Sequence, residues 1–325
     1  MGCLLAVAVV PVLQMLPLDA FHDGYNLTCA WAFESGCKLY TEILPIRSYQ
    51  FFVTWLSRRV LPQTVDAYLL TFSVLQLLPI IGAFALSMAW TRGRVWWSVS
   101  TAIVVMALSI LDSRQAIHLL LAAMMLNALH QDRHATWWLI GFGSVLAGGC
   151  GFDTLCPLAV ANTVTLFCVP SSERFAEPPP LWRRVLRATQ AVVLAIVPFS
   201  LVIGVWQGPQ AAAEHWLVLR DFAAHFNAFS GLPFEWHDQL TRFQVGLGLM
   251  VLTIWVSGGV VRWKMMPPAR RRAWLFLMIQ FGFLLHRGVG RSDLAHLQDV
   301  MIPSLVLLSL SLFECVKILR HTRQT

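Results

Sequence analysis

The chain has 325 residues, of which 57% are hydrophobic and only 13% are charged, and its formal net charge is +7. Its mean hydropathy of +0.63 excludes an ordinary water-soluble globule and indicates a polytopic membrane protein. We expect helices, because lipid cannot satisfy unpaired backbone groups. The positive charge requires no nucleic-acid partner, since it follows from the uneven distribution of Lys and Arg among the loops.

Ten apolar segments recur along the chain, each close to the length that a helix needs to cross about 30 Å of hydrocarbon. The first is interpreted as a retained span and not as a signal peptide, because it has no basic region and no small-residue cleavage site before Asp19. We therefore expect an all-α fold, a single transmembrane bundle over residues 1–325 with about ten spans. The predicted spans are 2–18, 67–90, 95–111, 115–129, 136–152, 155–170, 189–206, 243–261, 273–287 and 298–319.

The stretch DAFHDGYNL opens a large outer loop, residues 19–65, which is too apolar and too aromatic for a disordered linker. Residue spacing predicts one short helix over about 25–34 and a second, interfacial helix over about 49–59. The apolar side of the second helix is predicted to carry Phe51, Phe52, Trp55 and Leu56.

This layout holds Asp19, His22 and Asp23 at the mouth of the bundle. Asp19 and Asp23 are four residues apart and share a face in a helix-like turn. Two short outer turns add further candidates, since LDSRQ contains Asp112 and Arg114, and CGFDTLC contains Asp153. Acids or arginines are thus expected at several helix ends on one membrane face, as a site at the bundle mouth requires.

A second outer loop, residues 207–242, begins with an expected amphipathic helix in EHWLVLRDFAAHF, which contains His215 and Arg220. Its histidines and acids are candidates for binding a sugar or a divalent metal ion, although no tight ligand spacing supports a metal. No other cofactor is expected.

A third charged segment, HRGVGRSDLAHLQD, separates the last two predicted spans. Arg287 and Arg291 are four residues apart, and Asp293, His296 and Asp299 follow at steps of three. The planar guanidinium group of arginine pairs with phosphate or carboxylate through two hydrogen bonds. The segment is therefore either a phosphate-binding element or a charged loop held together by Arg–Asp pairs.

The loops also predict an orientation. If the amino terminus is cytoplasmic, the loops 91–94, 130–134, 171–188 and 262–272 and the tail from Lys317 hold 15 of the 24 Lys and Arg. The same side receives only four of the 17 acids, whereas seven of the ten histidines lie outside. The positive-inside rule then places both termini in the cytoplasm, and we expect a multi-pass protein of the bacterial inner membrane with its site facing the periplasm or exterior.

The acidic motif D-x-x-H-D-G, the segment ESGCKLY and the later GRSDLAHL together resemble the bacterial membrane glycosyltransferases of the GT-C superfamily. The resemblance implies a catalytic acid in the first outer loop, here Asp23 with Asp19 as the competitor. It also implies a sugar donor on polyprenyl phosphate and a reaction at the outer membrane face. The chain departs from that family in its short length and in lacking a paired DD or DE motif.

The expected chemistry needs few groups. A carboxylate removes the proton from an acceptor hydroxyl of a glycan or a lipid, and His22 or His296 orients it. The phosphate leaving group needs cations and no second acid, and Arg287, Arg291 and Arg220 are the candidates. Membrane lipids complete the expected partners.

Two other functions remain open from the sequence: a transporter or flippase of a lipid-linked or anionic substrate, and a GT-C-like protein that binds a lipid-linked sugar without transferring it. Transporters usually bind near the midplane at broken helices in repeated halves. The span interiors here are nearly free of charge and show no internal repeat, which weighs against transport. The cysteine pairs Cys29/Cys37 and Cys150/Cys156 either form bridges or are small buried apolar residues.

Overall fold

The computed structural model describes residues 22–38, 42–43, 48–64, 67, 70–71, 77–108, 118–124, 126–127, 135–150, 152–169, 180–230, 239–290 and 294–322. The described chain is all-α, as the sequence predicted. Its elements are α2 (His22–Glu34), α3 (Ser48–Val60), α5 (Leu78–Thr91), α6 (Val95–Leu108), α8 (Ala135–Cys150), α9 (Phe152–Cys168), α10 (Leu181–Gln207), α11 (Pro209–Ser230), α12 (Gln239–Arg262), the 3-10 helix η1 (Trp263–Met265), α13 (Pro268–Gly290) and α14 (Leu294–Thr322).

Three stretches of the described helices are long and apolar enough to cross a membrane: Leu181–Gln207, Arg242–Met265 and Val300–Leu319. Four shorter apolar helices accompany them: Leu78–Thr91, Val95–Ala107, Ile140–Gly149 and Thr154–Cys168. The positions of these helices follow the predicted apolar segments, although α10 begins eight residues before its predicted span. The total of about ten spans stays a prediction, and the first segment, 2–18, lies outside the described residues.

The two short helices predicted in residues 19–65 are present as α2 and α3, which pack against each other. Gly36, just after α2, has φ +100°, a conformation that glycine adopts without a steric penalty. Of the residues predicted on the apolar side of α3, Phe51 is fully buried and Leu56 is 57% exposed. In the described part of the chain, Cys37 and Cys156 are free cysteines, so neither predicted bridge is present there.

Helices α12, α13 and α14 form a closely packed unit. At one end, a Cβ added to Gly248 would lie 2.8 Å from Leu285 and 2.9 Å from Val300. At the other end, a Cβ on Gly259 would lie 1.9 Å from the ring of Trp274. Small residues of this kind let helix backbones approach closely where no hydrophobic force drives association.

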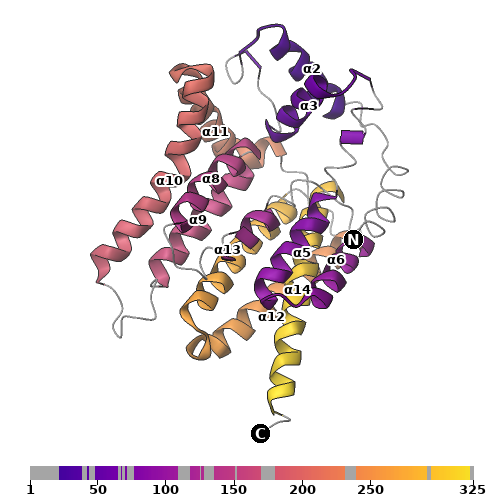
Figure 1. Cartoon of the computed structure of the whole chain (residues 1–325), viewed down its shortest axis with the longest axis vertical. Coiled ribbons are helices and arrows are strands. Elements are labelled where there is room, and N and C mark those ends of the chain that lie inside the picture. Colours follow the sequence, from indigo (N-terminus) through magenta and orange to yellow (C-terminus); the bar gives the residue numbers. More distant parts are fainter. Residues whose placement is uncertain are drawn as a thin grey trace.

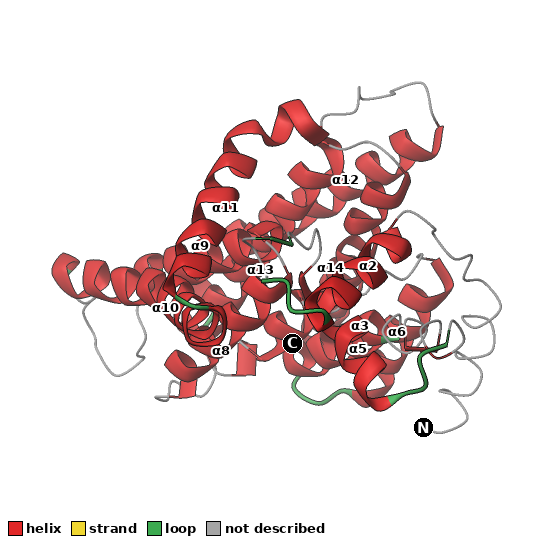
Figure 2. Cartoon of the chain, turned by 90° about the horizontal axis from the view of Figure 1, so that it is seen from above, coloured by secondary structure: helices red, strands yellow, loops and turns green. Residues whose placement is uncertain are grey.

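Helices α8, α9 and α10 form a second packed unit, and α9 joins it to α13. A Cβ on Gly148 of α8 would lie 2.6 Å from the ring of Phe199 in α10. Gly208, with φ +97°, ends α10, and Pro209 begins α11. Seen from above, α8, α9 and α10 lie on one side, α5 and α6 on the other, and α13 and α14 between them (Figure 2).

The bundle has two chemically different ends. Helices α2, α3 and α11 lie together at one end, and the carboxyl-terminal end of α14 lies at the other (Figure 1). We call the first the hairpin end, after the α2–α3 pair. The second is the basic end, because α14 brings Glu314 there into contact with Arg262 and Arg270.

Candidate functional site

Four of the predicted site residues belong to helix ends on the hairpin side of the bundle. Asp23 lies in the first turn of α2, and Asp153 in the first turn of α9. Helix α9 follows α8, which packs on α3. Arg287 lies in the last turn of α13 and His296 in the first turn of α14. Because α14 ends at the basic end, its first turn and the adjoining end of α13 face the hairpin end (Figure 1).

The structure places these residues by their helices only. The side chains of His22, Asp23, Asp153, Arg287 and His296 lie outside the description. Asp19, Asp112, Arg114, Arg291 and Asp293 lie outside the described residues altogether. Their contacts therefore stay predictions.

Phe33 holds α2 in place. Its ring meets Phe51 at 5.6 Å and Trp55 at 5.7 Å, both in α3, and Trp206 of α10 at 5.5 Å, each in an edge-on arrangement between ring centroids. Aromatic pairs of this geometry contribute beyond their buried area. The α2–α3 hairpin is thus fixed to the end of a membrane-length helix, so the first turn of α2 has a defined support.

An ion pair closes the same hairpin. Arg58 Nη2 donates to Glu34 Oε2 at 2.9 Å, and Arg58 Nε lies 3.2 Å from Glu34 Oε1, which makes the pair bidentate. The hydrogen bonds from Arg58 hold the pKa of the Glu34 carboxyl below its usual range. The ion pair therefore stabilises the hairpin fully at a pH above the usual pKa range of glutamate. Its contribution is lost in acid, when the carboxylate takes up a proton.

Arg220, the third candidate for binding phosphate, has a fully described contact. Its Nη2 lies 2.8 Å from Asp221 Oδ1, and both side chains are more than 60% exposed, at 68% and 61%. An exposed pair of adjacent residues contributes little stability, roughly 0–1 kcal/mol. Arg220 is therefore able to exchange this carboxylate for another anion.

His215, a candidate for metal or sugar binding in the sequence, is buried instead. Its ring lies 5.0 Å from Phe199 and 5.9 Å from Trp216, measured between centroids. Burial lowers its pKa to about 4, so the imidazole is neutral near pH 7. In the described part of the chain, no three metal-binding side chains come together, and the metal ion stays a prediction.

The pKa of His215 predicts an acid-sensitive fold. The folded pKa of about 4 lies below the unfolded value of 6.5, so the unfolded chain binds a proton first as the pH falls. The neutral His215 contributes fully to the free energy of unfolding above pH 6.5. As the pH falls towards 4 this contribution is lost, which lowers the free energy of unfolding by about 2–3 kcal/mol. We expect His215→Leu to flatten the fall in unfolding free energy between pH 7.5 and pH 4.5, measured in detergent. Identical slopes for the two proteins would contradict this assignment.

The basic end holds the best-defined polar cluster. Glu314 Oε2 accepts from Arg262 Nη1 at 3.1 Å, and Glu314 Oε1 accepts from Arg270 Nη2 and, at 3.2 Å, from Trp90 Nε1. The guanidinium of Arg270 also lies 4.8 Å from the centre of the Trp90 ring. One carboxylate thereby joins α5, α12, α13 and α14. Breaking such a buried pair on one side is costly, because the remaining charge is left without a counter-ion.

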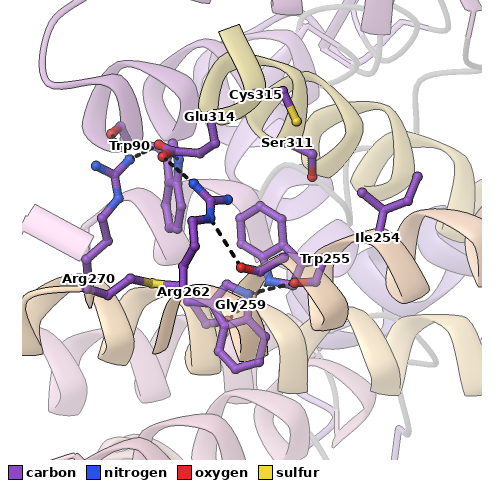
Figure 3. A pocket seen from close by; sticks show the side chains of 12 residues that line it. Trp90, Ile254, Trp255, Gly259, Arg262, Arg270, Ser311, Glu314 and Cys315 are labelled. Atoms are coloured by element: carbon purple, nitrogen blue, oxygen red, sulfur yellow. Dashed lines mark hydrogen bonds and ion pairs between the residues drawn. The ribbon is translucent and has the colours of Figure 1, made fainter. Parts of the chain in front are cut away.

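A small cavity, with a volume of about 70 Å³, opens beside this cluster. Figure 3 shows Arg262 reaching from α12 towards Glu314, with Ser311 and Cys315 on the neighbouring helix α14. The rest of the lining is largely aromatic and apolar, with Trp90, Ile254, Trp255, Gly258, Gly259, Met266, Arg270 and Trp274. Burial lowers the pKa of Arg270, Glu314 opposes this effect, and the positive charges of Arg92 and Arg262 add to it.

The sequence indicated this second cluster only weakly. Glu314 is an isolated acid in the apolar run LVLLSLSLFECVK, and an ionisable residue within a span is itself a sign of function or of a charge pair. Its partner Arg270 lies 44 residues away in the chain, and its partner Arg262 lies 52 residues away. Local spacing cannot reveal pairs at such separations.

No protein-family model, curated protein or solved structure matches the chain. Fold and composition define its class: the described part of the chain is helical and contains three helices long and apolar enough to cross a membrane.

Proposed function

We propose that the protein is a membrane glycosyltransferase. It moves a sugar from a polyprenyl-phosphate donor to a hydroxyl group of a glycan or lipid acceptor, at the hairpin end of the bundle. The observation that supports this proposal best is the gathering of α2, α9, α13 and α14 ends, with Asp23, Asp153, Arg287 and His296, at that single end.

In this proposal Asp23 is the base. An acceptor hydroxyl must lose its proton as it attacks the anomeric carbon, and a carboxylate within hydrogen-bonding distance accepts that proton. Asp23 begins a helix that Phe33 and Glu34 fix to α3 and α10. A catalytic group supported in this way has less freedom to leave the reactive geometry. His22 and Asp19 are the proposed neighbours that orient the base or the acceptor.

The donor phosphate is assigned to arginines at the same end. The bond from the anomeric carbon to the phosphate oxygen breaks with its electron pair leaving on the phosphate, so cations stabilise the departing group. The proposed pair is Arg287, in the last turn of α13, and Arg291, which follows α13 in the chain. Arg220 is the third, because its exposed pair with Asp221 is weak enough to be exchanged.

The membrane setting belongs to the proposal as well. The basic end is assigned to the cytoplasmic side and the hairpin end to the outer side of a bacterial inner membrane, with both termini cytoplasmic. The apolar surface of α10 supports a lipid-facing position, since Leu201 and Val205 are 59% and 86% exposed. A polyprenyl tail would lie against surface of this kind.

The experiment is transfer of radiolabelled sugar from a polyprenyl-phosphate donor by membranes that contain the wild-type protein or Asp23→Asn. Loss of the base is expected to reduce transfer by about a hundredfold or more. Glu214→Gln is the matched control, because it removes an acid of α11 that has no part in the proposed site and should keep transfer within a factor of about two. Asp19→Asn tests the competitor. Equal transfer by wild type and Asp23→Asn, at equal protein levels, would contradict the assignment.

A further inference from the structure

The cavity at the basic end carries an excess of positive charge. Its lining contains two guanidinium groups, those of Arg262 and Arg270, and one carboxylate, that of Glu314. The carboxylate uses one oxygen for each arginine, so it neutralises the pair only in part. Arginine stays protonated at any ordinary pH. The cavity therefore favours an anionic occupant.

An unpaired hydroxyl lines the same cavity. Ser311 is 91% buried, at 9% relative exposure, and its Oγ has no hydrogen-bond partner. A buried hydroxyl without a partner costs free energy. Other serines of the bundle, such as Ser304, satisfy their hydroxyl by donating to the carbonyl one turn earlier, at 2.6 Å to Val300 O. The Ser311 hydroxyl is thus available to an occupant of the cavity.

The cavity lies in the later turns of two membrane-length helices. Its lining residues Gly258, Gly259 and Arg262 come from the last turns of α12, and Ser311, Glu314 and Cys315 from the second half of α14. Both helices contain membrane-length apolar stretches. Next to the cavity, Ile254 and Leu312 are 41% and 52% exposed. A ligand with a charged head and an apolar tail would meet matching surface on both parts.

We propose that this cavity binds the phosphate group of an anionic membrane lipid, held by Arg262, Arg270 and the hydroxyl of Ser311. A volume of about 70 Å³ is roughly that of two water molecules, which suits one phosphate group and not an entire sugar or nucleotide. The acyl chains lie along Ile254, on the cavity wall, and along the exposed Leu312. Basic pockets between membrane helices recognise anionic headgroups by the same combination of charge and shape. This site lies opposite the hairpin end and does not depend on the proposed transferase activity.

The test is a titration of phosphatidylglycerol into the purified protein in phosphatidylcholine nanodiscs, with bound lipid counted by native mass spectrometry. Arg262→Gln should weaken phosphatidylglycerol binding about tenfold, since a charge-assisted hydrogen bond is lost. Ser311→Ala should weaken it roughly threefold to fivefold, the loss expected for a neutral hydrogen bond. Lys317→Gln, which removes an exposed charge from the same end of α14, is the control and should leave binding unchanged.

Ser311→Ala keeps the experiment decisive if Arg262→Gln unfolds. Without anionic lipid, Ser311→Ala should be at least as stable as the wild type, because it removes an unpaired buried hydroxyl. Unchanged phosphatidylglycerol binding in Ser311→Ala would overturn the proposal. So would an equal loss of binding in Lys317→Gln and Arg262→Gln, which would show diffuse attraction. Displacement of phosphatidylglycerol by an equal concentration of inorganic phosphate would overturn the lipid as the source of the phosphate.

Discussion

Glu314→Ala is expected to lower the free energy of unfolding by about 3–5 kcal/mol, because two largely buried guanidinium groups then lose their shared counter-ion. The side chains of Arg270 and Glu314 are 12% and 10% exposed, so water screens the remaining charges poorly. The variant also removes the acceptor of Trp90 Nε1. Denaturation in mixed micelles of a mild detergent and sodium dodecyl sulfate measures the effect.

Two further proteins distinguish charge imbalance from simple loss of packing. A triple variant removes all three charges by combining Arg262→Met, Arg270→Met and Glu314→Leu. It should recover most of the stability, since apolar replacements of buried ion pairs are often neutral or stabilising. Glu214→Ala removes an acid that pairs with Gln210 in the same helix and should change stability by less than about 0.5 kcal/mol. A triple variant as unstable as Glu314→Ala would refute this explanation.

Gly259→Ala should destabilise the protein by about 3 kcal/mol, near the upper end for an inserted methyl group. The new Cβ would lie 1.9–2.3 Å from three atoms of the Trp274 indole. That indole is buried, lies 5.8 Å from the ring of Trp263 between centroids, and donates to Trp255 O at 2.9 Å. The ring has no free end that could move aside, so α12 and α13 must separate.

The neighbouring glycine supplies the control. A Cβ on Gly258 would have its nearest neighbour at 3.6 Å, on Arg262 Nη2, which is an ordinary contact. Because alanine favours a helix over glycine by about 1 kcal/mol, Gly258→Ala should be neutral or stabilising. Unfolding of both variants in the same mixed micelles gives the comparison. Equal stability of Gly258→Ala and Gly259→Ala would show that α12 and α13 are not in close contact.

The sequence predicted most helices because their signals are local. Apolar runs predicted α6, α8, α9, α12, α13 and α14 within several residues of their observed bounds, whereas α5 begins at Leu78, eleven residues after the start of the predicted span 67–90. The short helices α2 and α3 were also predicted, by residue spacing and by the Ser-Gly pair after Glu34. Turn chemistry and periodicity act over a few residues, so one chain is enough to find them.

The sequence could not predict which helix faces meet. Leu56 and Phe51 were predicted on one apolar side of α3, and periodicity could not tell that Phe51 would be buried and Leu56 exposed. His215 was a candidate ligand on an amphipathic helix, yet Phe199 and Trp216 enclose it. Both outcomes depend on packing between distant segments, which a periodic pattern does not encode.

For the candidate site, the sequence predicted which residues share one membrane face but not how their side chains are arranged. Alternating loops predict that Asp23, Asp153, Arg287 and His296 share one face, and the structure describes only the helices that carry them, so their gathering into one site stays a prediction. Catalysis depends on atomic distances, and these are not a property of loop order. The Glu314 cluster is the opposite case: the structure shows contacts among its side chains that the order of the loops did not predict.

Trp255 and Trp274 form a reciprocal pair, in which Trp255 Nε1 donates to Trp274 O at 3.3 Å and Trp274 Nε1 donates to Trp255 O at 2.9 Å. Moving either helix by one residue shifts it about 1.5 Å along its axis and turns the side chain by roughly 100°, which breaks both bonds together. The pair therefore specifies a single alignment of α12 with α13. Since only η1 and a short turn connect these helices, we expect them to reach this alignment as one hairpin during membrane insertion, before more distant helices pack around them.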